Sequence, residues 1–191
     1  LTIPYGITSQ GDFRYAPDTL HTACTIVFGQ GSTHLRGGYR PSNATYTLQV
    51  ETDSLDLQQL LPASQWGIVS LQGQLSGQGN HYMHESTSMY GAVQLHALGW
   101  DVHTFSHASA QFSLSHRNLR LQASCLDTLM RWELSSAIRY APDRLHGKLH
   151  LRVDDLHTQS LRLSDTPLRP SFQCRATIDR DSTNTYTLSS R

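Results

Sequence analysis

The segment Leu145-His-Gly-Lys-Leu-His-Leu-Arg-Val153 decides the fold class of this chain. Its apolar residues Leu145, Leu149, Leu151 and Val153 occupy odd positions, and histidine, lysine and arginine occupy the even positions between them. Successive side chains of a β-strand point to opposite faces of a sheet. The two-residue period therefore predicts a strand with one apolar face and one polar face.

The same period recurs along most of the chain. The further apolar series are Leu20, Cys24, Ile26 and Phe28; Tyr46, Leu48 and Val50; Val69, Leu71 and Leu75; Val93, Leu95 and Ala97; Phe112 and Leu114; Leu119, Leu121, Ala123 and Cys125; Phe172, Cys174, Ala176 and Ile178; and Tyr186 and Leu188. The intervening positions are mostly Gln, Ser, Thr, His and Arg, so one face of each strand is wet. Strands buried on both faces would instead read as continuous aliphatic runs, and we therefore predict antiparallel pairing.

Turn signals separate these strands, and helix signals are few. Ala141-Pro-Asp143 is typical of the turns. The best helix candidate is Ser54–Leu61, where Leu57, Leu60 and Leu61 share one helical face ahead of a proline. We expect an all-β fold with only short helices.

The chain also repeats itself around 13–28 and 138–153. Phe13-Arg-Tyr-Ala-Pro-Asp-Thr-Leu-His21 returns as Ile138-Arg-Tyr-Ala-Pro-Asp-Arg-Leu-His146, and both copies run into an alternating strand. Such self-similarity indicates an array in which each unit shares the apolar face of its neighbours. We interpret residues 1–191 as a single segment of this array, cut from a longer protein, since the chain starts at Leu1 without a signal peptide.

Charge and composition exclude some functions. Lys and Arg total 15, as do Asp and Glu, so the basic excess of a nucleic-acid-binding protein is missing. Apolar residues make up 38% and aromatic residues 8% of the chain, which is low for a sealed core of this length. Some apolar surface is therefore expected to face something other than a compact core.

The cysteines and histidines give no metal or catalytic pattern. Cys24, Cys125 and Cys174 lack C-x-x-C spacing and lie in apolar phases, so we interpret them as unpaired, buried thiols. His146 and His150 lie four residues apart on a predicted strand, about 13 Å, which is too far for one zinc ion.

Two other histidine pairs, His81 with His84 and His103 with His107, could share a metal only within a turn or helix, and no cysteine or carboxylate completes them. No G-x-S-x-G motif is present, and Gly73–Gly79 lies within a predicted strand, not in a phosphate loop. We predict no metal, no cofactor and no enzymatic activity.

The stretch from Leu48 to Leu156 resembles the TamB and AsmA-like family of envelope proteins. The features that carry the resemblance are the Leu55-Asp-Leu57 turn with Leu60-Leu61-Pro62, the Gly67–Gly79 strand, the Gly91–Leu95 strand, the Leu119–Leu121 strand, and Leu145–Leu156, which ends on a second Asp-Leu turn.

The resemblance implies an elongated, curled, solenoid-like antiparallel sheet, taco-like in section, whose apolar concave face forms a groove. It implies a segment of an envelope-spanning bridge in a Gram-negative bacterium that carries phospholipid between the inner and outer membranes through the periplasm. Its implied partners are phospholipid acyl chains and an outer-membrane barrel assembly protein, with an inner-membrane anchor in the parent chain. The residues expected to line the groove are Leu71, Leu75, Val93, Leu95, Leu119, Leu121, Leu149, Leu151 and Val153.

A different class of function fits the same pattern. An adhesin-like β-solenoid or sandwich at a cell surface would use the apolar phase as an ordinary closed core. The aliphatic side chains expected at the groove suit mobile acyl chains, whereas a sealed core more often recruits Phe and Trp. The two interpretations therefore differ in what covers the apolar face.

Overall fold

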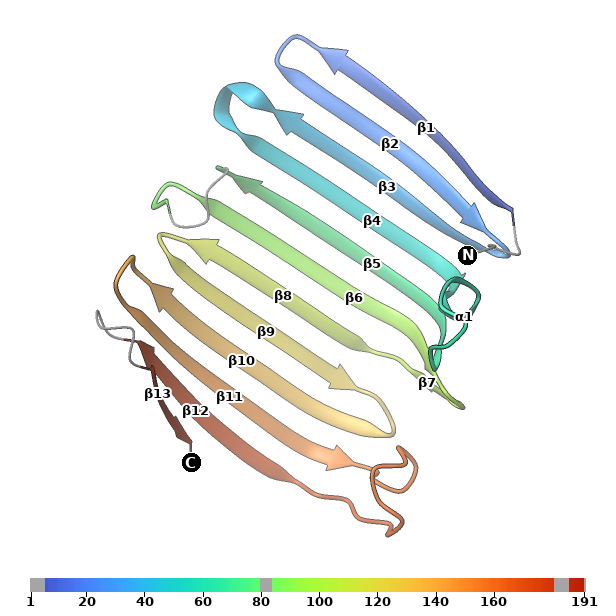
Figure 1. The fold of residues 1–191 in the computed structure, drawn as a ribbon, viewed down its shortest axis with the longest axis vertical. Coiled ribbons are helices and arrows are strands. Elements are labelled where there is room, and N and C mark those ends of the chain that lie inside the picture. Colours follow the sequence, from blue (N-terminus) through green and yellow to red (C-terminus); the bar gives the residue numbers. More distant parts are fainter. Residues whose placement is uncertain (1–5, 80–83, 181–185, 191) are drawn as a thin grey trace. The chain divides into compact units, whose positions relative to one another are not determined.

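A computed structural model describes residues 6–79, 84–180 and 186–190 of the chain. The all-β prediction is confirmed, because 70% of the described residues are in strands, the strands of each unit pair antiparallel, and helical structure among these residues is minimal (Figure 1). The chain divides into two compact units, Leu1–Gln78 with Gly91–His107, and Gly79–Tyr90 with Ala108–Arg191.

Unit 1 is a meander of consecutive strands in the order β1 to β6, with β7 paired to β6. Its strands are β1 (Ile7–Ala16), β2 (Thr19–Phe28), β3 (Gly31–Arg40), β4 (Thr45–Asp56), β5 (Trp66–Gln78), most of β6 (Ser88–Trp100) and β7 (His103–Phe105); a 3₁₀ turn η1 (Pro41–Asn43) joins β3 to β4. Cross-strand partners point to the same face, so Cys24, Leu35 and Val50 lie side by side on β2, β3 and β4.

Unit 2 is a second meander, from β8 to β13. Its strands are β8 (Ala108–Ser115), β9 (Asn118–Leu126), β10 (Met130–Tyr140), β11 (Leu145–Leu156), β12 (Phe172–Arg180) and β13 (Tyr186–Ser190). Leu134, Leu151 and Cys174 form one of its cross-strand rows. In both units the register gathers the predicted apolar phases on one face and the polar phases on the other.

The repeat proves to be a hairpin that occurs once in each unit. Tyr15 pairs with Leu20 in the β1–β2 hairpin, and the equivalent Tyr140 pairs with Leu145 in the β10–β11 hairpin. The shared sequence therefore fixes the same strand register in both places, which supports the interpretation of a repeat-like strand arrangement.

The predicted helix is shorter than expected. Helix α1 runs only from Leu57 to Leu60, because residues 54–56 still belong to β4. Ser54 has a φ of 52°, within a bulge that shifts the β4–β5 register between Thr52 and Leu55. The Asp56 side chain then accepts a hydrogen bond from the Gln58 backbone N–H at 3.0 Å, which caps the helix. The prediction of Ser54–Leu61 was wrong at the amino-terminal end, where the bulge continues the strand.

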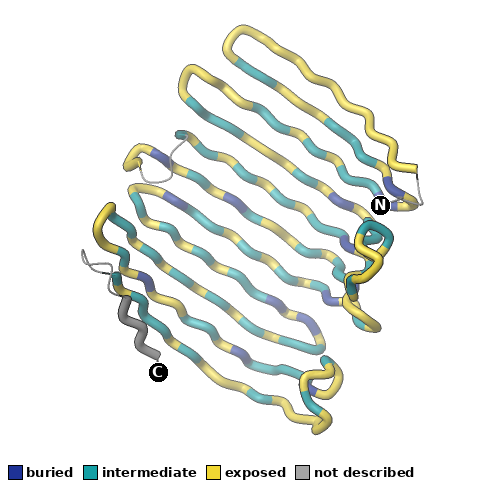
Figure 2. The backbone as a smooth tube through the Cα atoms, in the orientation of Figure 1, coloured by how far each residue is buried: buried dark blue, intermediate teal, exposed yellow. Residues whose placement is uncertain are grey.

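Few hydrophobic side chains are buried. Among the described residues they are Phe28, Val69, Phe105, Leu114, Cys125 and Val153. Along most strands of each unit, half-buried positions alternate with exposed ones (Figure 2). The apolar phase is thus partly shielded by neighbouring side chains without being enclosed. No helix within the described ranges is both long and apolar enough to cross a membrane.

Candidate functional site

The four expected groove residues of unit 1 lie on its apolar face. Leu75 is the cross-strand partner of Leu48, and Leu71 lies four residues before Leu75 on the same strand, so both point to this face. Val93 joins them, since a Cβ placed on Gly73 would lie 3.6 Å from its Cγ2 atom. Leu95 lies two residues beyond Val93 on β6. Val93 is 43% exposed, so this face is open to solvent in unit 1.

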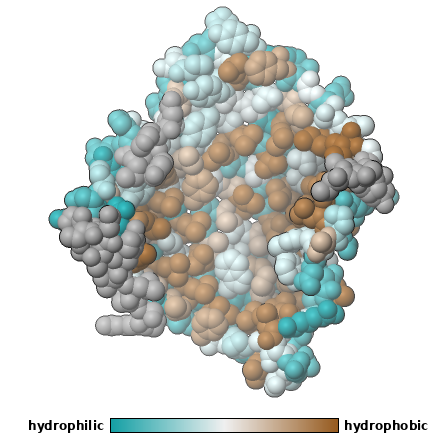
Figure 3. Space-filling view, viewed as in Figure 1, coloured by the Kyte–Doolittle hydropathy of each residue, from teal (hydrophilic) through white to brown (hydrophobic). Residues whose placement is uncertain are grey.

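The five expected groove residues of unit 2 also share one face. Leu121 and Leu149 flank Ser136 on β9, β11 and β10. Leu119, Leu151 and Val153 follow the same phase at two-residue steps along β9 and β11. Exposure varies along β11, from 38% at Leu149 to 7% at Val153. Figure 3 shows hydrophobic side chains gathered on the face that it presents.

The expected groove lining left out part of the unit 2 face, namely all of β10 and Phe172, which the sequence had placed in an apolar series. Trp132 and Phe172 flank Val153 on the neighbouring strands, so one end of the face is aromatic. Leu134 and Ile138 continue the row along β10. The signal in β10 was a two-residue period of Met, Trp and Leu that Ser136 interrupts. The lining is therefore less uniformly aliphatic than the predicted residues alone suggest.

Glycines keep the apolar faces from overcrowding. A Cβ on Gly73 in unit 1 would lie 2.7 Å from Cγ1 of Val50. A Cβ on Gly147 in unit 2 would lie 2.7 Å from Cγ2 of Ile178. Larger residues would collide with these β-branched neighbours, whose side chains have little rotational freedom. Each glycine therefore leaves room on the apolar face for the aliphatic side chains of the neighbouring strands.

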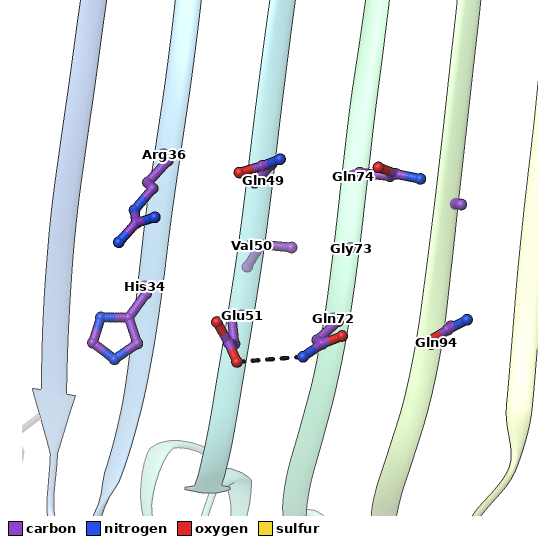
Figure 4. Close-up of a pocket in the computed structure, with 10 residues that line it drawn as sticks. His34, Arg36, Gln49, Val50, Glu51, Gln72, Gly73, Gln74 and Gln94 are labelled. Atoms are coloured by element: carbon purple, nitrogen blue, oxygen red, sulfur yellow. Dashed lines mark hydrogen bonds between the residues drawn. The ribbon is translucent and has the colours of Figure 1, made fainter.

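The polar face of unit 1 contains a hollow of about 610 Å³ (Figure 4). His34 and Arg36 border it from β3, Glu51 from β4, Gln72 from β5 and Gln94 from β6. The Gln72 amide donates a hydrogen bond of 3.3 Å to the Glu51 carboxylate. The hollow can hydrogen-bond water or a polar ligand, but its amides and charges are unsuited to an acyl chain. The sequence did not predict this hollow, because each residue that lines it, taken by itself, is typical of a solvent-exposed strand position.

The polar face of unit 2 carries hydrogen-bonded side-chain pairs, both between neighbouring strands and along single strands. His146 Nδ1 and Asp179 Oδ1, on the paired strands β11 and β12, lie 2.5 Å apart. Arg152 donates a hydrogen bond of 2.7 Å from Nε to Oδ1 of Asp154. These groups are about half-exposed, so such pairs contribute little to stability individually.

The histidines form no metal site in the described part of the chain, where no group of three or more His, Cys, Asp or Glu residues is arranged to hold an ion. His146 and His150 lie on strand β11, as predicted. His103 lies in β7, whereas His107 follows it with a φ of 54°. His81 of the remaining pair lies outside the described residues.

Trp66 and Trp100 pack against each other within unit 1. They lie on β5 and β6 with ring centroids 4.4 Å apart and an interplanar angle of 86°. This is an edge-to-face aromatic pair. Trp132 belongs to unit 2, on its apolar face.

The cysteines lie on separate strands and form no disulfide within the described residues. Cys125 on β9 and Cys174 on β12 are separated by the two intervening strands of the sheet, about 14 Å at the usual strand spacing. Burial raises the pKa of the Cys125 thiol, and the negative charge of the Asp127 carboxylate raises it further. The hydrogen bond from the Asp127 backbone lowers this pKa, but by less than burial raises it. Cys125 is therefore a neutral, unreactive thiol near neutral pH. Cys24 and Cys174 are only half-buried, so the prediction of burial holds for Cys125 alone.

Comparison of the chain with protein-family models, with curated proteins and with solved structures yielded no match.

Proposed function

We propose that the apolar faces of the two units bind phospholipid acyl chains. The observation that carries this proposal is that the apolar residues gathered on one face of each unit remain about half-exposed. A hydrocarbon chain lying along such a face would remove apolar surface from water on both partners, at roughly 0.8 kcal/mol per buried CH₂ group. The aliphatic side chains at Leu71, Leu95 and Leu149 offer acyl chains no hydrogen-bonding group, so the chains could slide along them.

The exposure of the face favours lipid over a closed core. The core of a sandwich or solenoid is normally buried, and its residues touch many neighbours. Leu149 and Val93 are instead 38% and 43% exposed. A surface interaction domain of the adhesin type, the alternative function, would need another layer over these residues. No such layer lies over the face within either unit in the described part of the chain.

The broader role follows the resemblance in sequence. In this proposal the chain is a segment of a bridge across the periplasm of a Gram-negative bacterium, and phospholipid passes along it between the inner and outer membranes. An outer-membrane barrel assembly protein would be its protein partner, and no chemical step would be catalysed.

Photo-crosslinking tests the proposal on both units. A benzophenone amino acid placed at Leu95 or at Leu149 should capture phospholipid when the chain is purified from membranes under mild conditions. The matched controls are His96 and Lys148, each exposed and adjacent in sequence but on the opposite face. Lys148 is a sharper control than His150, whose Nε2 atom is buried.

The expected result is a lipid adduct at Leu95 and Leu149 and none at the two controls, read by mass spectrometry of the intact protein. Equal labelling on both faces would indicate nonspecific hydrophobic capture. A folded chain that never gives an adduct at Leu149 would overturn the proposal and favour the interaction domain.

A further inference from the structure

Three cationic residues surround Ala137 on the polar face of unit 2. Arg120 on β9 and Lys148 on β11 lie opposite Ala137, one on each side of it. Arg139 lies two residues beyond Ala137 on β10, so its side chain belongs to the same face. All four residues are exposed. Each cationic residue therefore has its Cα atom about 5 to 7 Å from that of Ala137, so the three long side chains can converge above the alanine methyl group.

The positive charge of this cluster is not neutralised by any acidic residue that the structure describes. Arg120, Arg139 and Lys148 form no ion pair with a residue in the described ranges. Apart from Ala137, their cross-strand neighbours are Ser113, Asn118, His146 and Thr177. Asp179 lies diagonal to Lys148, but its carboxylate is already hydrogen-bonded to His146. Like charges on neighbouring strands repel one another, so the cluster costs stability unless an anion joins it.

The internal repeat shows that this charge is specific to unit 2. In the equivalent β1–β2 hairpin of unit 1, Asp12 occupies the position of Ala137. Its cross-strand partner Ala23 occupies the position of Lys148. The arginine is kept as Arg14, which therefore has a carboxylate two residues away on its own face. The two hairpins share one register and differ in charge, so the fold of the hairpin does not require the cluster.

The arrangement suits a tetrahedral anion. Ala137 contributes only a methyl group, so the space above it is open to a ligand that the flanking side chains can contact from three directions. Ser135, two residues before Ala137 on the same face, adds an exposed hydroxyl group. A phosphate group presents oxygens to all three cations, and a guanidinium can form paired hydrogen bonds with two of them. A carboxylate has only two oxygens, in one plane, and would leave one of the cations without a partner.

We infer that Arg120, Arg139 and Lys148, with the hydroxyl group of Ser135, bind a doubly charged phosphate group, that of free phosphate or of a phosphomonoester. Each exposed ion pair contributes little, so we expect weak binding, with a Kd on the order of 1 mM. The site lies on the face of unit 2 opposite the proposed lipid surface and does not rest on the proposed function. Because a crosslinker at Lys148 would remove one of the cations, that position remains a valid control for the apolar face.

An NMR titration of the full 191-residue chain tests the site. The probe is inorganic phosphate, exchanged for sodium chloride at constant ionic strength, and the readout is the backbone amide shifts of Ser135 and Ala137. Ala137→Asp introduces the residue that unit 1 has at this position, and the register tolerates it because Asp12 occupies the equivalent place. Arg139→Ala removes one cation from the cluster. The matched control is Arg14→Ala, which removes an exposed arginine at the equivalent position of unit 1.

Saturable shifts should centre on Ser135 and Ala137. Ala137→Asp should weaken phosphate binding about tenfold, because a negative charge then occupies the centre of the cluster. Arg139→Ala should weaken it severalfold, and Arg14→Ala should leave it unchanged. Shifts spread evenly over the basic residues of both units, shifts that do not saturate, or an unchanged affinity in Ala137→Asp would overturn the inference.

A second measurement distinguishes the two sources of the phosphate group. The chain is sedimented with phosphatidylcholine vesicles that either contain or lack phosphatidic acid, whose headgroup is a phosphomonoester. Sedimentation that requires phosphatidic acid and is lost in Ala137→Asp would identify a lipid headgroup as the ligand. If the titration shows binding and sedimentation is absent or equal in both proteins, the ligand is free phosphate.

Discussion

Leu149 and Val153 lie on the same face of β11, four residues apart, and differ mainly in how much of each is exposed. Leu149 is 38% exposed, whereas Val153 is 7% exposed between Trp132 and Phe172. If the apolar face is open, an arginine at the two positions should have very different effects on folding. The comparison therefore tests the openness of the face without any lipid.

The magnitudes follow from burial. Full burial of a leucine is worth roughly 1.5 to 3 kcal/mol, so Leu149→Arg should lower the free energy of unfolding by only about 1 kcal/mol, since the new guanidinium reaches water. Val153→Arg would place an unpaired charge among buried side chains, at a cost of roughly 3 kcal/mol or more. Lys148→Arg on the polar face is the control and should be close to neutral.

The assay is urea unfolding followed by tryptophan fluorescence. Replacing Trp66 and Trp100 by phenylalanine leaves Trp132 as the single reporter, located in unit 2 beside Val153. The slope of the unfolding free energy against urea concentration should be the same in all variants. Differences in the urea midpoint then convert directly to differences in the free energy of unfolding. Equal, large losses for Leu149→Arg and Val153→Arg would show that something covers the whole face, and would refute the open-face reasoning.

Three further predictions concern single positions. Gly147→Val should lower the free energy of unfolding by about 1 to 3 kcal/mol, because its Cβ would lie 2.7 Å from Ile178 Cγ2; an unchanged urea midpoint would contradict this. Asp56→Ala should cost about 1 kcal/mol by removing the cap on Gln58, whereas Asp56→Asn should retain most of the stability in the same titration. The raised pKa of Cys125 favours the neutral thiol in the folded state, so stability should fall as pH rises above the ordinary thiol value of about 8.5. Cys125→Ala should remove that alkaline loss, and a pH profile identical in both proteins would count against it.

The sequence predicted the strands well because each has a wet face. In a single-layered sheet with one solvated side, the two-residue period directly indicates which side chains point to water. Leu149, Leu151 and Val153 were placed on one face from that period alone, and the register agrees. The period failed for β10, where Ser136 occupies an apolar-phase position and breaks the pattern, and for β1 and β3, whose apolar phases are interrupted by Ser9 with Gly11 and by Thr33 with Gly37.

The helix boundary and the surface features could not be predicted, since they depend on neighbours distant in sequence. The spacing of Leu57, Leu60 and Leu61 suggested a helix that begins at residue 54. Ser54 instead remains in a bulged strand, where its backbone N–H donates to the hydroxyl of Ser70. The polar hollow arises where side chains from four strands meet, which no single strand reveals. The cations around Ala137 come from three strands, and periodicity carries no information about which residues lie opposite one another.

The meander topology has a consequence for how the protein folds. Almost every pairing within a unit joins strands that are consecutive in sequence, so each hairpin closes a short loop before the next is added. Low contact order of this kind favours fast folding for a β-protein and allows it to start at more than one hairpin. Because few side chains are buried, the folding of strands at one end of a unit depends little on the strands at the other end. Unfolding should then proceed strand by strand from the edges, and hydrogen-exchange protection should decline gradually toward β1 instead of falling in a single step.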